Sequence, residues 1–438
     1  VKWANLHGVP LLPVSSQEGL RIHGDSVPNT EGQLIVDLSP WQKIHHVDAK
    51  NRSVLLQPGV TFQQLIPRLK KKGLRPLMPL LPRAGKSVLS SGLEREPITI
   101  PRYHWDMGDP ILCMGVIFGT GDRFRTGSAA GPGTLKHQRK SGQAHLVPMG
   151  PTQFSPGQLI QGAQGSLGIV TWATIKCEYM PDETKIYHVQ SSNVTSLIEI
   201  QHLLLKYRYC DEIFIMDDKN LASLLADDNS NPQGLSKQIQ PWNLIFRTSG
   251  RGNLAERRVK YIHDDIIELV SPITEMETLN SAPVDYRELE RVLETTAPDQ
   301  WRARWAGNFL DIFFLAKQDS LEKYVKIAQD FKDMIDMGFY FQPVNLGTSI
   351  HCEIDLYHGK SPEIAHEKLI DIHDSLVDRC LKAGAFFSRP YLLTAKQVFS
   401  ACDVKNVKLL NKIKQLFDPM GILNPGVLCF DDFFQERR

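Results

Sequence analysis

The stretch from Leu34 to Pro79 constrains the fold most, because it joins two strands to a helix through short connections. The apolar run Leu34–Leu38 predicts a short buried strand, and Val54–Gln57 predicts a second. The polar residues Asp48–Arg52 are typical of the turn between them. Pro58–Gly59 then ends the second strand, so a helix is expected to follow directly.

That helix is predicted to begin at Thr61, whose hydroxyl can cap it. Gly73 is expected to end it. Pro67 falls inside and should kink it, at a cost of about 3 kcal/mol if the geometry were forced. One face of the helix carries the apolar residues Phe62, Leu65, Ile66 and Leu69.

Two later motifs are more specific. Residues 162–171 read GAQGSLGIVT, in which Gly162, Gly165 and Gly168 allow tight backbone turns before a strand that begins at Ile169-Val170. Residues 417–426 read FDPMGILNPG and follow a helix predicted over 404–416.

These three stretches together resemble the vanillyl-alcohol oxidase and p-cresol methylhydroxylase (PCMH) superfamily of FAD-linked oxidases, which includes enzymes acting on glycolate and D-lactate. The resemblance implies an α+β protein. Residues 1–181 would form a PCMH-type FAD-binding domain of two subdomains, residues 182–402 a cap or substrate domain, and residues 403–438 a segment that returns to the FAD domain. Val1–Gly8 resembles the tail of a helix, and Val9–Val14 a strand, so the domain is expected to be incomplete at its N-terminus.

The resemblance implies that FAD is bound by several glycine and hydroxyl residues. A first loop would present two glycines and three serines near the pyrophosphate, and His23 in that loop is interpreted as having no covalent role, so the flavin is expected to be non-covalent. A second loop would contribute Gly85 and Ser87, and the two later motifs the remainder. The implied set is Ser15, Ser16, Gly19, His23, Gly24, Ser26, Gly85, Ser87, Gly162, Gly165, Ser166, Gly168, Ile169, Val170 and Asn424.

Beyond Lys185 the pattern alternates between strands and helices, which predicts one antiparallel sheet covered by helices. Strands are expected at 186–190, 213–216, 242–247, 309–315 and 351–356. Helices are expected at 194–208, 220–226, 253–270, 320–337 and 361–383. In the first domain, 111–118 and 123–127 are predicted to form a hairpin, and Ser128–Ser155 is predicted to be a long surface insertion without periodicity.

The substrate residues are expected in the cap domain. Arg389 would clamp an anionic group of the substrate, with Tyr391 as its partner, and the order of this pair is altered from that of vanillyl-alcohol oxidase. His351 is the candidate proton acceptor, although a satisfied core histidine on a strand fits the same pattern. Only His351 remains of the metal motif seen in glycolate and lactate enzymes, so no metal is expected.

A further stretch, His104-Trp105, matches vanillyl-alcohol oxidase, but Tyr103 stands where that enzyme has an aspartate. Packing beneath the flavin is the alternative interpretation for this pair. Arg68 and Lys70–Lys72 are interpreted as a solvated helix face.

Composition excludes several other classes. Lysine and arginine number 50 against 49 for aspartate and glutamate, which argues against nucleic acid as a partner. No apolar run reaches the roughly 18 residues that a membrane span needs. The seven cysteines are scattered and lack a C-x-x-C spacing, so a cytoplasmic location is the default prediction.

The predicted activity is hydride transfer from an alcohol or a 2-hydroxy acid to flavin N5, with the protein supplying orientation, an anion clamp and a proton acceptor. Electrons would then pass to oxygen or to a carrier protein. Two alternatives are a phenol oxidase of the 4-hydroxybenzyl alcohol type and a flavin-fold remnant without activity.

Overall fold

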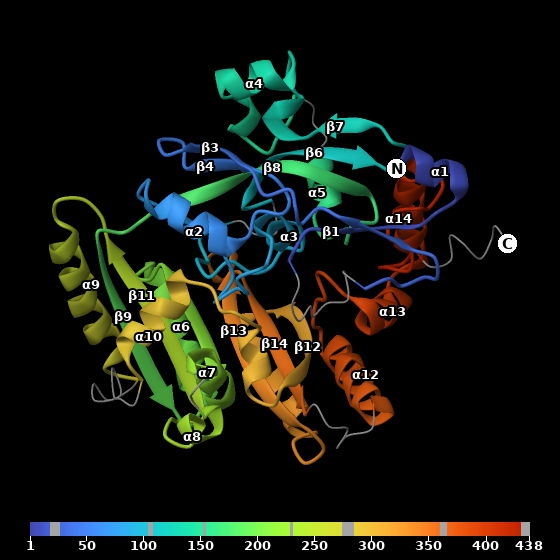
Figure 1. Ribbon diagram of the computed structural model, residues 1–438. Helices are drawn as coiled ribbons and strands as arrows, with labels where there is room; N and C mark the ends of the chain where they lie inside the picture. Colours follow the sequence, from blue (N-terminus) through green and yellow to red (C-terminus); the bar gives the residue numbers. More distant parts are fainter. Residues whose placement is uncertain are drawn as a thin grey trace.

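The computed structural model describes residues 1–17, 27–103, 108–151, 155–227, 231–273, 284–359 and 366–430. Two main sheets organise them (Figure 1). Sheet A has the order β3-β4-β8-β6-β7, with β5 paired to β8. Sheet B has the order β12-β14-β13-β10-β11-β9. Every strand pair in both sheets is antiparallel, which agrees with the predicted α+β class.

The N-terminal residues form helix α1 (Lys2–His7), which ends at Gly8 with φ at 65°, as the glycine predicted. Strand β1 (Leu11–Val14) pairs in parallel with β2 (Leu34–Asp37). The prediction that β2 is buried was wrong: Leu34 and Ile35 are each about half exposed, at 50% and 49%. The reason is its position, because β1 and β2 form a two-stranded sheet of their own outside sheet A.

The predicted turn at residues 48–52 is present, but it joins a different pair of strands. It connects β3 (Ile44–Asp48) to β4 (Ser53–Leu56), and β3 was not predicted as a strand. β3 contains two adjacent histidines and has no residue that is fully buried, so its hydrophobic signal is weak. β4 is buried along its whole length, as expected for the inner strand of the hairpin.

Helix α2 (Phe62–Lys70) begins as predicted. The Thr61 side chain accepts from the backbone of Gln64, and the Gln64 side chain accepts from the backbone of Thr61, so the two form a capping box. Pro67 lies inside the helix without ending it. The helix stops three residues before Gly73, which has φ at 67° and starts the turn into β5 (Leu74–Pro76).

Sheet A is completed by β6 (Ile111–Phe118), β7 (Arg123–Arg125) and β8 (Gly168–Tyr179). Its core packs α2 and α3 (Val88–Leu93) against the inner strands. The segment predicted as an insertion without periodicity is partly helical: Thr134 caps α4 (Leu135–Ser141), and Ala129 and Ala144 are buried in a small core with Trp172. The apolar residues of this segment are small and are separated by glycines. Its hydrophobic pattern was therefore too weak to predict this packing. Helix α5 (Pro156–Ile160) follows.

Sheet B begins directly after β8. Its strands are β9 (Glu183–Ser191), β10 (Glu212–Asp217), β11 (Trp242–Gly250), β12 (Asn308–Ala316), β13 (Asp336–Val344) and β14 (Ser349–His358). Its helices are α6 (Val194–Tyr207), α7 (Asp218–Leu225), α8 (Pro232–Ser236), α9 (Ala255–Val270), α10 (Tyr286–Glu294), α11 (Leu321–Gln329) and α12 (His366–Lys382).

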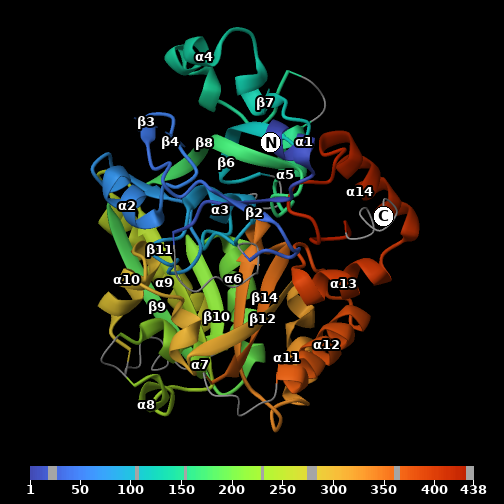
Figure 2. The same ribbon diagram turned by 45° about the vertical axis from the view of Figure 1, so that its right-hand side comes forward.

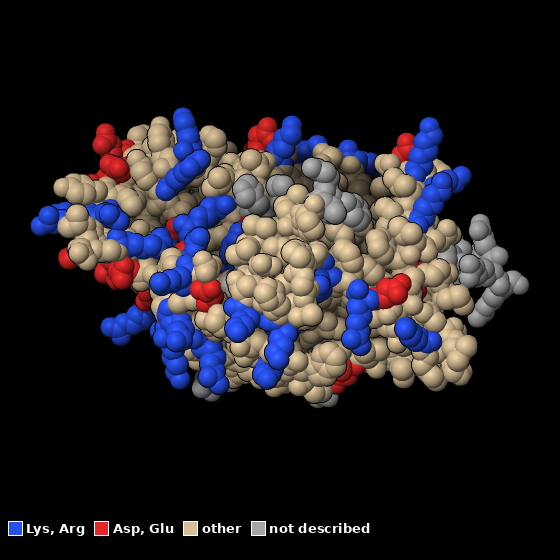
Figure 3. All heavy atoms as spheres, turned by 90° about the horizontal axis from the view of Figure 1, so that it is seen from above, with Lys and Arg blue, Asp and Glu red and all other residues tan. Residues whose placement is uncertain are grey.

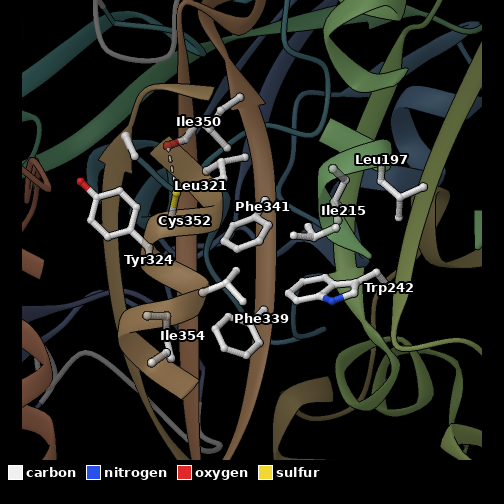
Figure 4. Packing of buried hydrophobic residues seen from close by; sticks show 14 of the residues in the cluster. Leu197, Ile215, Trp242, Leu321, Tyr324, Phe339, Phe341, Ile350, Cys352 and Ile354 are labelled. Carbon is white, nitrogen blue, oxygen red and sulfur yellow. Dashed lines mark hydrogen bonds between the residues drawn. The ribbon is translucent and has the colours of Figure 1, made fainter. Parts of the chain in front are cut away.

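Helices cover both faces of sheet B. On one face α6, α9, α11 and α12 enclose the larger core, in which Trp242 lies against Phe341 and Phe339 (Figure 4). On the other face α7 and α10 pack over Phe214 and Ile245, and Leu80 and Leu81 from the first part of the chain join them. This second core connects sheet B to the loop that follows β5.

One helix predicted among the strands of sheet B was too long. The sequence indicated a helix over 320–337, whereas α11 ends at Gln329 and residues 336–344 form the central strand β13. Aromatic residues alternate along β13 at Phe339 and Phe341, facing the larger core, with Tyr340 on the opposite face. The aromatic residues alternate only after Gly338. Because the apolar residues before it follow a helical period, the sequence pattern did not indicate a strand there.

The C-terminal residues return to the first part of the chain (Figure 2). Helices α13 (Leu392–Ala401) and α14 (Val404–Phe417) lead back from sheet B. Leu423 then bridges to Leu11, and the Asn424 backbone N–H donates to the Leu11 carbonyl at 2.7 Å. Strand β1 near the start of the chain is therefore in direct contact with the segment that follows α14.

Candidate functional site

Two clefts are candidate sites: the first lies within the first 170 residues, and the second lies between residues 79–97 and sheet B. The first cleft is formed by the loop after β1, the Pro58 turn, helix α3 and the glycine-rich turn before β8. Its lining combines hydroxyls and backbone with apolar side chains. The lining residues are Pro13, Val14, Ser15, Ser16, Leu38, Pro58, Leu89, Ser90, Leu93, Glu94, Ile160, Gln164, Gly165, Gly168 and Val170.

Hydrogen bonds join the loops that form this cleft. Ser16 Oγ accepts from the Ser87 backbone N–H at 3.1 Å, and Ser87 Oγ donates to the Pro58 carbonyl at 2.5 Å. The Gln17 backbone N–H donates to the Gly85 carbonyl at 2.9 Å. Three segments that are distant in sequence are thus held as one wall.

Two glycines are required for the close packing of this wall. Gly165 has φ at +72°, and a Cβ there would lie 2.7 Å from Pro13 Cγ, in the neighbouring strand β1. A Cβ on Gly168 would lie 2.5 Å from Val116 Cγ1 in strand β6. The turn at 162–168 therefore brings the backbone closer to β1 and β6 than any side chain would allow.

The sequence-predicted cofactor residues separate into three groups. Ser15, Ser16, Gly165, Gly168 and Val170 line the first cleft. Others stand behind its walls, where they shape it without facing it: Gly85, Ser87, Gly162, Ser166, Ile169 and Asn424. Four lie outside the described residues, namely Gly19, His23, Gly24 and Ser26.

Two members of the second group have identifiable roles. Ser166 Oγ donates within its own turn to the Ala163 carbonyl at 2.6 Å. Asn424 Nδ2 donates to the Gln164 carbonyl at 2.6 Å, and its Oδ1 accepts from Gln33 at 3.0 Å. Both side chains fix the position of the glycine-rich turn.

A buried carboxylate stands at the inner end of the first cleft. Glu94 accepts from Ser90 Oγ at 2.5 Å and pairs with Lys86, which also lies 3.0 Å from Glu96. Lys86 and Glu96 belong to the lining of the second cleft. This ion cluster separates the two clefts and neutralises the Glu94 charge.

The second cleft is built on the alternation of sheet B. In β14 the residues Ile350, Cys352 and Ile354 face the larger core, so His351, Glu353 and Asp355 face the opposite way. Register places Glu353 between Phe313 and Tyr340, and His351 beside Gln342. The lining is Pro79, Leu80, Leu81, Pro82, Arg83, Lys86, Glu96, Pro97, Gln300, Arg302, Asp311, Phe313, Tyr340, Gln342, His351, Glu353 and Arg389.

His351 is placed in this cleft as a neutral imidazole. Its Nε2 lies 3.2 Å from Glu353 Oε2. Burial lowers the pKa of His351, and the Arg389 and Arg302 charges lower it further, although Glu353 opposes them. Because the carboxylate accepts from Nε2, the second ring nitrogen, Nδ1, carries the lone pair that can accept a proton.

Sequence reasoning missed the residues that surround His351. Arg302 forms an ion pair with Glu353 and lies 3.4 Å from Asp355, with its guanidinium 4.0 Å from the Trp301 ring centre. Burial opposes ionisation of Glu353, but Arg302 and His351 hold its pKa at about 2. Burial and the Glu353 charge raise the pKa of Asp355. The alternation of polar residues at 351, 353 and 355 was the signal that could have found this group.

Arg389 is also in the second cleft. It is 4% exposed, its Nη1 donates to the Glu94 carbonyl at 3.2 Å, and its guanidinium lies 4.4 Å from the Phe313 ring centre. Its Nε has no hydrogen-bond partner, and within the described part of the chain no carboxylate lies within 4.0 Å of it. Arg389 is therefore a buried cation whose charge is open to a bound anion.

Other predicted substrate residues lie elsewhere. Tyr391 does not line the second cleft but an adjoining apolar chamber, which Arg389 also lines; its ring centre is 6.1 Å from that of Phe313. The Tyr103 hydroxyl donates to Glu178 in strand β8, away from both clefts. His104 and Trp105 lie outside the described residues.

Three comparisons connect this geometry with known proteins. Residues 1–88 match the FAD binding domain family. The chain is 22% identical to the flavoprotein subunit of 4-cresol dehydrogenase (hydroxylating) from Pseudomonas putida, over 97% of this chain and 84% of that protein. It is also 22% identical to D-lactate dehydrogenase from Anaerostipes hadrus, over 98% of this chain and 86% of that protein.

A solved structure shows the same fold. The structure of p-cresol methylhydroxylase with substrate bound superposes with a TM-score of 0.79 at 19% identity, covering 99% of this chain and 86% of that one. The chain thus carries an FAD binding domain, has the fold of p-cresol methylhydroxylase, and is similar along nearly its whole length to FAD-linked oxidoreductases. The resemblance and the fold inferred from residues 34–79, 162–171 and 417–426 are thus confirmed.

The first cleft of this FAD-linked oxidoreductase fits its cofactor. Gly165 packs against Pro13 too closely for any side chain, so the glycine keeps its backbone at the wall of the cleft. Ser15 and Ser16 offer hydroxyls, Gln164 an amide, and Leu38, Leu89 and Val170 an apolar surface. These residues would hold FAD, whose phosphates need polar donors and whose rings need apolar contact.

Some features lie outside the clefts. Arg68 and Lys70–Lys72 are exposed at the end of α2, as a solvated helix face requires. Residues 1–181 contain 20 lysines and arginines against 11 aspartates and glutamates, and basic side chains predominate on the face seen in Figure 3.

Across the described ranges, no helix combines the length and apolar character needed to span a membrane. Nor does that part of the chain hold a cluster of three or more side chains suited to a metal ion.

Proposed function

We propose that this FAD-linked oxidoreductase oxidises the C–H bond of a small organic anion that carries a hydroxyl group, with a 2-hydroxy acid as the first candidate. The observation that carries the proposal is Arg389, a buried guanidinium of the second cleft that has no carboxylate partner among the described residues. A planar fork of this kind suits a carboxylate, which it can bind through two parallel hydrogen bonds.

His351 supplies the second requirement, a proton acceptor near the clamp. The flavin supplies the hydride acceptor when bound. Neutral Nδ1 of His351 would take the hydroxyl proton as the C–H bond breaks, and Glu353 would stabilise the resulting imidazolium through Nε2. Arg302 keeps Glu353 ionised for that purpose.

The lining charge of the second cleft agrees with an anionic substrate. Four basic side chains, Arg83, Lys86, Arg302 and Arg389, stand against the three acidic residues Glu96, Asp311 and Glu353. Of the four, Arg302 and Lys86 are paired with carboxylates, and Arg83 donates to the Gln17 carbonyl at 3.0 Å. Arg389 is thus the cation best placed to attract the substrate.

A phenol of the 4-hydroxybenzyl type is the second candidate. The similarity to 4-cresol dehydrogenase and the aromatic rings of Phe313 and Tyr340 in the cleft favour it. The test is anaerobic bleaching of the protein-bound flavin by a panel of 2-hydroxy acids and 4-alkylphenols. Reduction by hydroxy acids alone supports the first candidate, and reduction by phenols alone supports the second. A flavin that no member of the panel reduces contradicts both.

A further inference from the structure

We infer that the apolar chamber beside the second cleft holds an apolar tail of the substrate, so the enzyme acts on amphipathic anions rather than on the smallest hydroxy acids. The inference rests on the proposed function, because it assigns the head group to Arg389. The chamber is bounded by β12 and by helices α12 and α13, which lie beside one another in Figure 2.

The size of the two spaces motivates the inference. The chamber measures about 340 Å³, whereas the second cleft measures about 70 Å³ by the same measure. A substrate that extends beyond its head group therefore finds more room in the chamber than in the second cleft.

The lining of the chamber indicates the chemistry of that extension. Aromatic and aliphatic side chains dominate it, and Leu392 and Leu393, which are 50% and 40% exposed, stand where it opens to solvent. The lining is Asn308, Phe309, Leu310, Asp311, Phe313, His358, His373, Arg389, Pro390, Tyr391, Leu392, Leu393 and Thr394. An alkyl or aryl group would gain free energy by leaving water for this surface.

The two spaces share Asp311, Phe313 and Arg389. The Arg389 guanidinium stacks on the Phe313 ring, so the clamp for the anion stands at the boundary of the chamber. A molecule whose carboxylate binds Arg389 can therefore direct its tail along Phe313 toward Phe309 and Leu393.

His373 closes the inner wall. Its Nε2 lies 3.2 Å from Thr394 Oγ1, and its Nδ1 lies 2.9 Å from Asp374 Oδ1. These contacts join α12 to the start of α13 and fix the chamber wall without a ligand. A preformed wall lowers the ordering cost of binding.

The test is calorimetric titration of the flavin-loaded protein with acetate, hexanoate and octanoate, which need no turnover. Affinity should rise by roughly tenfold or more from acetate to octanoate, because each methylene adds buried apolar area. The heat-capacity change of binding should become more negative along the series. Equal affinity for acetate and octanoate would overturn the inference without any variant.

A substitution then locates the tail. Leu393→Trp should reduce the ratio of octanoate to acetate affinity, whereas Leu416→Trp on α14, at a site 70% exposed, should leave the ratio unchanged. The same reduction in both variants would contradict the assignment of the chamber. Octylamine, which carries the opposite charge, should bind more weakly than octanoate, since Arg389 would repel it.

The two proposals fail in different ways. If octanoate binds with the expected length dependence but no hydroxy acid or phenol bleaches the flavin, the proposed function is wrong and the chamber assignment stands. If lactate reduces the flavin and 2-hydroxyoctanoate gives no higher kcat/KM, the proposed function stands and the tail assignment is wrong.

Discussion

The ammonium group of Lys414 lies 2.6 Å from the carboxylate of Asp418, at a place where both side chains are fully buried. Lys414 also donates to the carbonyls of Ser166 at 2.5 Å and Leu423 at 2.8 Å. Asp418 in turn accepts from the backbone N–H groups of Ile422 and Leu423. One buried ion pair thus joins the C-terminal segment to the glycine-rich turn of the cofactor cleft.

Lys414→Met should therefore destabilise the protein and weaken its hold on FAD. Removing one partner leaves Asp418 as an unpaired buried charge, which typically costs about 3–5 kcal/mol. Chemical unfolding measures the loss of stability, and the flavin-to-protein ratio after dialysis measures retention. Lys412→Met, at an exposed position of the same helix, is the control. Equal behaviour of the two variants would show that the ion pair contributes nothing.

The proposed clamp makes a separate prediction. Arg389→Lys keeps the positive charge and loses the planar fork, so it should weaken substrate binding by roughly tenfold or more. The concentration dependence of flavin reduction in stopped flow gives the affinity. Arg379→Lys, in an exposed ion pair with Asp330, should bind substrate like the wild type. Unchanged affinity in Arg389→Lys would move the clamp to another residue.

A pH profile tests His351. Its pKa is lowered from 6.5 by burial, so the imidazole stays neutral, and able to accept a proton, at pH values below 6.5. Flavin reduction should therefore decline only when the pH falls below that value. Protonation of His351 should also lower the stability of the fold. The unfolded chain takes up the proton first, so stability decreases as pH falls from 6.5 through the folded pKa.

Two variants complete this test. His351→Ala should slow flavin reduction by about 10²–10⁴-fold, the usual effect of losing a positioned base. Glu353→Gln removes the group that raises the His351 pKa, so the acid limb should move to still lower pH. An acid limb at or above 6.5 in the wild type would contradict the role of His351.

Local signals predicted much of the fold. The Thr61 cap and the Gly8 helix end act through neighbouring residues, and each appears as expected. Gly162 and Gly165 also adopt the positive φ of a tight turn. β3 and β13 were missed because their strand character depends on partners far along the chain. β2 looked buried for a related reason, since its apolar residues face solvent in a sheet that the sequence did not reveal.

The candidate site shows the same limit. His351 and Arg389 were predicted singly, and the structure brings them to one cleft. Their surroundings depend on strand register, which pairs Glu353 with Tyr340 of β13 and with Phe313 of β12. Arg302 comes from a separate short helix at Trp301–Arg304. No spacing in the sequence encodes those cross-strand pairs. The domain boundaries at 181 and 402 and the individual cofactor residues stay predictions.

The non-covalent flavin expected from the resemblance can be tested directly. Acid precipitation should release all of the flavin into the supernatant, which absorbance measures. His23 is the residue that a covalent bond would most concern, and it lies outside the described residues. Colour that remains with the wild-type pellet and disappears in His23→Ala would overturn the expectation.

The contact between the two sheets yields the last prediction. Glu212 in β10 accepts from Arg75 of β5 at 2.5 Å and from Arg247 of β11 at 2.5 and 2.9 Å. Burial opposes ionisation of Glu212, but the two guanidinium groups hold its pKa at about 2. Since the unfolded value is near 4.3, the pair contributes on the order of 3 kcal/mol above that pH.

That contribution should be lost as pH falls from about 4.3 toward the folded pKa, because the unfolded chain binds the proton first. Glu212→Gln should remove it at neutral pH and flatten the acid branch of the stability curve. Urea unfolding between acid and neutral pH measures both. Glu322→Gln, whose carboxylate pairs with Lys326 on an exposed helix surface, should leave the curve unchanged. A wild-type acid branch in Glu212→Gln would show that the charge of Glu212 does not hold the sheets together.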